Sequence, residues 1–409
     1  MTARLHRLAN GLTVAVEPMS HVETAAIGLY ADVGSRSEPD GLTGLAHMVE
    51  HMVFKGAGSR DARQLAEAIE DVGGQLNAWT ARDQTVFHAR VLPGDLPLAV
   101  DLVADLVRAP VFDAKELERE KQVVLAELGE ARDTPDDIVF DHLAAAAYPS
   151  QAYGRPVLGT EQTIAAIDVA HLHGWLADQY RPSGLVLAAA GAVDEEALLR
   201  LAESRFGDLA AGNPPAPAPA TFASGKATDA RRFDQVHIAF AHPGVDQCHP
   251  DLHALSLFAG IAGGGMSSRL FQEVREVRGL AYSVYAWAQA TADTGQLGVY
   301  LAAGKADAPR AFALARDVLA RCAETLDEAE LARAKAQARA GLLMGLEGVQ
   351  ARCDHLARTI QVHGRIVPPA ETVAEIDAVT IAQARRAGTA ALSGGLATAS
   401  VGGRLAKAA

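Results

Sequence analysis

The feature that most constrains the fold is an internal repeat, which divides the chain of 409 residues into two similar halves. The segment DAKELEREKQVVLAEL begins at Asp113 and corresponds to DEAELARAKAQARAGL, which begins at Asp327. A repeat this long indicates duplicated domains, because the units of solenoid proteins are much shorter. The stretch 210–231 is rich in proline and alanine and is typical of a linker. We therefore expect a domain over 1–209, a linker over 210–231 and a homologous domain over 232–409.

Each half begins with residues that favour strands. Asn10-Gly11 is a strong hairpin signal, and Leu12, Val14 and Val16 alternate after it. TAAIGLYADV and QVHIAFAHPG occupy corresponding places in the two halves, and long segments rich in Ala, Leu, Glu and Arg follow. The sequence predicts an α+β protein of two tandem homologous domains, each with a mostly antiparallel sheet and helices packed to one side.

The run GLTGLAHMVEHMVFKG, from Gly41 to Gly56, contains the pattern H-x-x-E-H. Its apolar residues recur at helical spacing, so His47 and His51 project from one face and can bind a single metal ion. Glu50 lies on the same side, where it can accept a proton from a water molecule on the metal. The pattern favours a hydrolytic zinc site, and the alternative is an amphipathic core helix with two histidines by chance.

A catalytic zinc ion usually takes three protein ligands, so a third is needed. The segment from Glu116 to Glu130 has a helical apolar stripe and supplies the candidate carboxylates, which are Glu116, Glu118, Glu120, Glu127 and Glu130. Glu120 and Glu127 share a face of this helix because they are two turns apart. Spacing alone does not choose among the five, and each could be an ordinary surface carboxylate.

Three segments together resemble the pitrilysin-type zinc metallopeptidases, the inverzincins, and in particular their short bacterial branch, which resembles mitochondrial processing peptidase. These segments are GSRSEPDGLTGLAHMVEHMVFKG, GGQLNAWTARDQTVFHARV and EREKQVVLAE. The resemblance implies that His47, His51 and Glu127 bind zinc. It also implies that Glu120 supports them in catalysis. At the repeat's offset these glutamates correspond to Ala334 and Gly341, and the second half has no H-x-x-E-H, so we expect one zinc ion per chain.

The resemblance also implies four substrate contacts. Asn77 and Ala78 would lie on a strand beside the zinc and bind the peptide, although from the sequence alone this is an ordinary internal strand. Arg275 and Tyr282 match an arginine and a tyrosine that reach the substrate from the far half, where they would act in catalysis and binding. Without the resemblance, Arg275 would be interpreted as a surface charge and Tyr282 as a core residue.

These residues predict a zinc-dependent endopeptidase. Water activated by the metal attacks the peptide carbonyl, and Glu50 is the general base. Long family members enclose the substrate between two halves, so a chain of this length is expected to close its chamber as a homodimer. Such a chamber admits peptides and unfolded segments.

Composition limits the partners and the location. A net charge of −13 argues against nucleic acid and favours basic peptides. No apolar run is long enough to span a membrane, the N-terminus lacks a signal-peptide core, and the three cysteines show no disulfide or metal spacing. We expect a cytoplasmic protein with no membrane partner. The rival hypotheses are a catalytically silent partner subunit and a metal- or peptide-binding module without turnover.

Overall fold

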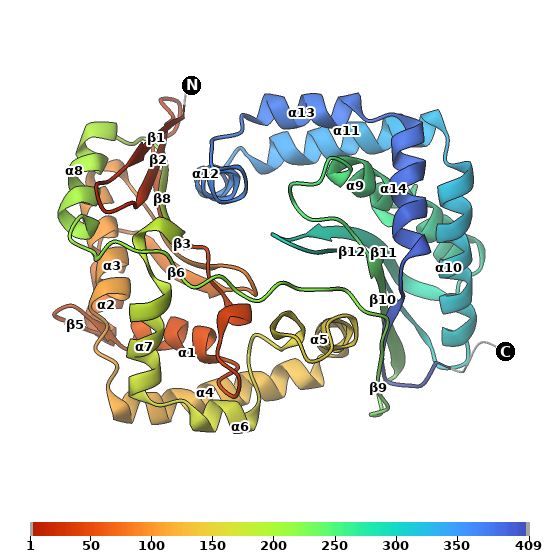
Figure 1. Ribbon diagram of the computed structural model, residues 1–409, viewed down its shortest axis with the longest axis horizontal. Helices are drawn as coiled ribbons and strands as arrows, with labels where there is room; N and C mark the ends of the chain where they lie inside the picture. The colour runs from red at the N-terminus through yellow and green to blue at the C-terminus, as the bar shows by residue number, and fades with distance from the viewer. Residues whose placement is uncertain (1–2, 406–409) are drawn as a thin grey trace. The chain divides into compact units, whose positions relative to one another are not determined.

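The computed structural model describes residues 3–405, and the chain in it forms two compact units (Figure 1). Unit 1 comprises the residues up to Leu128 together with Pro156–Ala218 and Met344–Val367. Unit 2 comprises Gly129–Arg155, Pro219–Leu343 and the residues from Pro368 onward. The compact units therefore differ from the predicted halves 1–209 and 232–409, because each unit takes in one segment from the other half of the sequence.

Within the described residues, unit 1 has a six-stranded sheet with the strand order β1-β2-β8-β3-β7-β6. The strands are β1 (Arg4–Arg7), β2 (Thr13–Pro18), β8 (Leu185–Gly191), β3 (Ala25–Ala31), β7 (Thr85–Val91) and β6 (Gln75–Thr80). Only the β2–β8 pair is parallel. β1 and β2 form the predicted hairpin, whose turn holds Gly11 at a φ of 100°.

The sheet of unit 2 repeats this order without a counterpart of β1. In the part of the chain that the structure describes it has five strands in the order β11-β12-β10-β13-β9. They are β11 (Ala281–Ala290), β12 (Gly295–Gly304), β10 (Gln235–Pro243), β13 (Ala397–Val401) and β9 (Lys226–Asp229). The parallel pair, β13–β9, corresponds to β2–β8. The prediction of two similar, mostly antiparallel α+β domains is confirmed, although β9 lies within the predicted linker.

Helices cover one face of each sheet most heavily. In unit 1 they are α1 (Leu45–Val53), α2 (Ala62–Glu70), α3 (Leu96–Arg108), α4 (Ala114–Asp133, in unit 1 as far as Leu128), α6 (Glu161–Ala166), α7 (Val169–Gln179) and α8 (Glu195–Phe206). In unit 2 they are α9 (Leu252–Gly263), the π-helix η5 (Phe271–Val277), α10 (Ala308–Thr325), α11 (Glu328–Gly345, in unit 2 as far as Leu343), α13 (Pro369–Ala378) and α14 (Ile381–Ser393). None of the helices in the described chain is long and apolar enough to cross a membrane.

The expectation of helices on one side only is wrong, because the second face of each sheet is also covered. In unit 1, α12 (Val349–His363) packs an apolar stripe that includes Cys353 and Leu356 against β2, β3 and β8. In unit 2, α5 (Pro135–Ala147) packs Val139 and Leu143 against β10 and β13 in the same way. α5 follows α4 and α12 follows α11, so corresponding helices of the two repeats each pack on the sheet that the other half of the sequence forms. Burial of these apolar stripes explains why the compact units cross the predicted boundary.

Candidate metal centre and active site

The candidate site is built on α1, which spans Leu45–Val53 as the apolar pattern predicts. Met48, Val49 and Met52 are fully buried in the core of unit 1 and fix this face of the helix. Residues four apart share a face of a helix, so His47 and His51 are held side by side. Their ring centroids are 4.5 Å apart.

A buried carboxylate holds the first turn of α1. The N-cap residue, Gly44, has a φ of 94° and no side chain to cap the helix. Glu38 supplies the missing acceptors, because its Oε2 accepts from Gly44 N at 2.9 Å and its Oε1 accepts from Ala46 N at 2.8 Å. Its negative charge also suits the positive end of the helix dipole.

The two histidines and Glu127 of α4 converge on one point. The Nε2 atoms of His47 and His51 are 3.2 Å apart, and the carboxylate oxygens of Glu127 lie 3.8 Å from the first and 3.5 Å from the second. Two nitrogen ligands of a tetrahedral zinc ion, each about 2.05 Å from the metal, lie about 3.4 Å apart. In the described part of the chain these three residues form the one group of His, Cys, Asp or Glu side chains that could hold a metal.

The protonation of the site suits a metal ligand set. Burial, with a smaller contribution from His51, lowers the pKa of His47 to about 3, so the imidazole is neutral and its nitrogen can bind a cation. The buried Nδ1 atom of His47 has no hydrogen-bond partner among the described residues. Two close imidazole Nε2 atoms facing a carboxylate are a donor set that zinc prefers.

Glu50 lies beside this group. Burial raises its pKa, the Thr80 hydroxyl and His51 oppose the rise, and Glu127 adds to it. Its buried Oε2 has no hydrogen-bond partner in the described structure. A carboxylate whose pKa is raised and whose oxygen has no hydrogen-bond partner accepts a proton more readily than an ordinary exposed glutamate does.

Glu120 of α4 contacts the site from behind His51. Its Oε1 accepts from Nδ1 of His51 at 3.1 Å, and its Oε2 forms an ion pair with Lys55 Nζ at 2.7 Å. Of the five candidate glutamates, Glu127 and Glu120 therefore face the histidines. The remaining three, Glu116, Glu118 and Glu130, lie outside the group, and Glu116 and Glu118 pair with Arg119 and Lys121 of their own helix.

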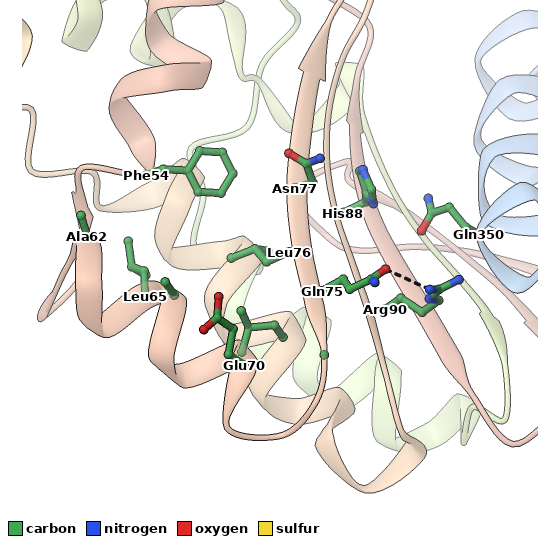
Figure 2. Close-up of a pocket in the computed structure, with 13 residues that line it drawn as sticks. Phe54, Ala62, Leu65, Glu70, Gln75, Leu76, Asn77, His88, Arg90 and Gln350 are labelled. Carbon is green, nitrogen blue, oxygen red and sulfur yellow. Dashed lines mark hydrogen bonds between the residues drawn. The ribbon is translucent and has the colours of Figure 1, made fainter. Parts of the chain in front are cut away.

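Asn77 and Ala78 lie on β6, which is the edge strand of its sheet. Ala78 is buried in the core that includes α1, whereas Asn77 is exposed and its Oδ1 accepts from Ala78 N at 2.9 Å. A groove of about 510 Å³ follows the strand. Figure 2 shows Phe54 and Leu65 on one side of β6 and His88 on the other.

Arg275 and Tyr282 belong to unit 2, where the structure places them against each other. Arg275 lies on η5, and its Cζ is 4.4 Å from the ring centroid of Tyr282 on β11 and 4.7 Å from that of Phe271. Tyr282 is 72% exposed, so it is a surface residue and the interpretation as a core residue is wrong. The guanidinium and the exposed phenol can both donate hydrogen bonds to a ligand.

Sequence reasoning missed Glu38, Lys55 and Thr80. Lys55 had a usable signal, because it follows His51 by four residues and therefore falls on the same face of the helix. Glu38 and Thr80 had none, since their contacts with Gly44 and with Glu50 depend on how a loop and a strand meet α1.

Comparisons with known proteins identify the family. The family model described as insulinase (peptidase family M16) matches residues 13–161, and that described as peptidase M16 inactive domain matches residues 166–338. An uncharacterised zinc protease of Streptomyces coelicolor is 35% identical over 389 residues, which are 93% of this chain and 85% of the relative. The zinc protease YmxG of Bacillus subtilis is 33% identical over 374 residues, 91% of each chain.

Solved structures show the same fold. A peptidase M16 inactive domain from Pseudomonas fluorescens matches with a TM-score of 0.89 and 23% identity, covering 99% of both chains. A protease from Helicobacter pylori matches with a TM-score of 0.89 and 20% identity, covering 98% of this chain and 99% of the other. Fold, site and relatives define a zinc metallopeptidase. The chain belongs to peptidase family M16, the pitrilysin type, as the sequence resemblance predicted.

Proposed function

We propose that the protein is an endopeptidase that binds one zinc ion per chain through His47, His51 and Glu127. The observation that carries this proposal is the 3.2 Å approach of two imidazole Nε2 atoms opposite the Glu127 carboxylate. The absence of both glutamates at Ala334 and Gly341 supports a single zinc ion in each chain.

When bound, zinc supplies a Lewis acid that polarises a carbonyl and lowers the pKa of water. Glu50 takes a proton from the attacking water and passes it to the leaving amine as the C–N bond breaks. Burial raises the pKa of Glu50 and so makes it a better proton acceptor. Glu120 hydrogen-bonds Nδ1 of His51 and so presents the opposite nitrogen to the metal.

The peptide binds in extended form along β6. An edge strand offers unpaired backbone groups to an added strand, and the groove beside β6 has room for its side chains. Asn77 and Ala78 contact this peptide near the scissile bond. Arg275 and Tyr282 donate to the substrate and to developing oxyanion charge, and their mutual stacking and exposure support that role.

We further propose that the protein belongs to the inverzincin branch that resembles mitochondrial processing peptidase, and that two copies form a homodimer enclosing a chamber. These assignments rest on the family resemblance. Peptides and unfolded segments are the substrates, and the net charge of −13 favours basic ones. Among the described residues Cys248, Cys322 and Cys353 form no disulfide, which supports a reducing, cytoplasmic location.

The test compares wild type with Glu50→Gln, on bound zinc and on cleavage of a mixed peptide library by mass spectrometry. Glu50→Gln keeps the size and removes the base, so we expect zinc to be retained and kcat/KM to fall by about 10²–10⁴-fold. Glu67→Gln is the matched control, because Glu67 is an exposed residue of α2 paired with Arg63. A wild type that binds zinc but cuts nothing would indicate a silent subunit or a binding module.

A further inference from the structure

Lys55 makes a contact that the proposed chemistry does not use. It follows the C-cap residue of α1, and its backbone N–H donates to Met52 O at 3.1 Å, which continues the helical turn. Its Nζ lies 2.7 Å from Oε2 of Glu120. The side chain of Glu120 is only 6% exposed, whereas that of Lys55 is 32% exposed.

Each oxygen of the Glu120 carboxylate therefore has its own partner. Oε2 meets the Lys55 ammonium, and Oε1 accepts from Nδ1 of His51 at 3.1 Å. A proton on Nδ1 leaves Nε2 with its lone pair, and this Nε2 is the atom that faces His47 and Glu127. Three side chains therefore form one chain of contacts, from a partly exposed cation to a metal-ligand atom.

From this geometry we propose that Lys55 is a positioning residue, which acts through Glu120 to fix the ring orientation and tautomer of His51 for zinc. A nearly buried carboxylate is costly without a cation, and with Lys55 removed it loses the contact that holds its second oxygen. Lys55 follows His51 by four residues, in the turn just past the end of α1, and both side chains contact the same Glu120 carboxylate. The inference rests on the proposed zinc site and adds a residue to it.

The competing explanation is an ion pair that only stabilises the fold by joining α1 to α4. That role would lower the stability of the metal-free protein and leave its zinc affinity unchanged. The positioning role instead lowers the affinity of folded protein for zinc. The two roles are separated by measuring both quantities on the same variants.

The experiment measures the zinc dissociation constant by competition with a chromophoric chelator, together with thermal unfolding of the metal-free protein. Replacing a residue that orients a metal ligand typically weakens zinc binding about 10- to 100-fold, so we expect Glu120→Gln to fall in that range and Lys55→Met to weaken binding about tenfold. Lys55→Arg should restore most of the affinity, because it keeps the charge. Lys121→Met is the matched control, since Lys121 also pairs with a glutamate of α4, Glu118, outside the metal group.

The double variant Lys55→Met/Glu120→Gln gives the sharpest test. If Lys55 acts through Glu120, the double variant binds zinc no more weakly than Glu120→Gln alone. Full zinc affinity in Lys55→Met, or a loss equal to that of Lys121→Met, would overturn the inference and leave the zinc site standing. A wild type without zinc affinity would instead remove the site itself, and the role of Lys55 with it.

Discussion

Helices α4 and α11 occupy corresponding places in the repeat, but they differ at the positions that matter for a metal. Leu117 of α4 and Leu331 of α11 match in the repeat, and each is only 2% exposed. Three positions further along the repeat, Glu120 is 5% exposed and the corresponding Ala334 is 6% exposed. Unit 2 therefore shows that this scaffold packs well with a methyl group there. A buried carboxylate at the same place in unit 1 costs free energy, and its contacts with His51 and Lys55 explain why it is present.

Exchanging the matched residues of the two helices should affect zinc binding and cleavage only when the change is made in α4. Glu127→Gly copies Gly341 into α4, removes a zinc ligand and should lower cleavage by about three orders of magnitude or more, with zinc lost from the purified protein. Gly341→Glu should change neither quantity, because an added Cβ there meets no atoms within 4 Å and, among the described residues, unit 2 holds no group of side chains that could bind a metal. Metal analysis and peptide cleavage measure both variants. Zinc retained at wild-type affinity in Glu127→Gly would contradict the assignment of Glu127.

Removing a large core side chain from each unit separates folding from metal binding. Phe87 and Phe240 are fully buried in the cores of units 1 and 2. Phe87→Ala and Phe240→Ala should each lower the free energy of unfolding by about 3–5 kcal/mol, as the loss of a buried aromatic ring does. Denaturant titration measures the loss. Phe240→Ala should leave zinc affinity within about twofold, since its core excludes α1. An equal loss of zinc affinity in both variants would show that zinc binding in unit 1 depends on the packing of the unit 2 core.

The smallest predicted effect concerns the start of α1. Glu38→Ala removes two hydrogen bonds to a charged acceptor, and we expect a loss of about 2 kcal/mol in the free energy of unfolding. Asp61→Ala, which removes the N-cap of the exposed helix α2, is the control and should cost about 1 kcal/mol. Chemical denaturation of the metal-free proteins measures both. A loss in Glu38→Ala no larger than in the control would show that Glu38 does not hold the helix.

Local patterns in the sequence were sufficient to predict α1, the first hairpin and the duplicated sheet, because each of these depends on neighbours along the chain. The family resemblance selected Glu127 from five glutamates that helical spacing left equivalent. The partners of α5 and α12 were not predictable, since an apolar stripe shows that a face is buried and not which sheet buries it. Glu38 was missed for the same reason, because the loop that brings it to Gly44 leaves no periodic pattern.

The central claim is a single zinc ion held by two imidazoles and a carboxylate in unit 1. X-ray absorption at the zinc edge, on protein with its metal content measured, reports the number and type of these ligands. We expect one zinc ion per chain, with two imidazole nitrogens and the remaining ligands oxygen, all at about 2.0–2.2 Å. A sulfur ligand at about 2.3 Å, or wild-type zinc content in a variant that lacks both His47 and His51, would contradict it.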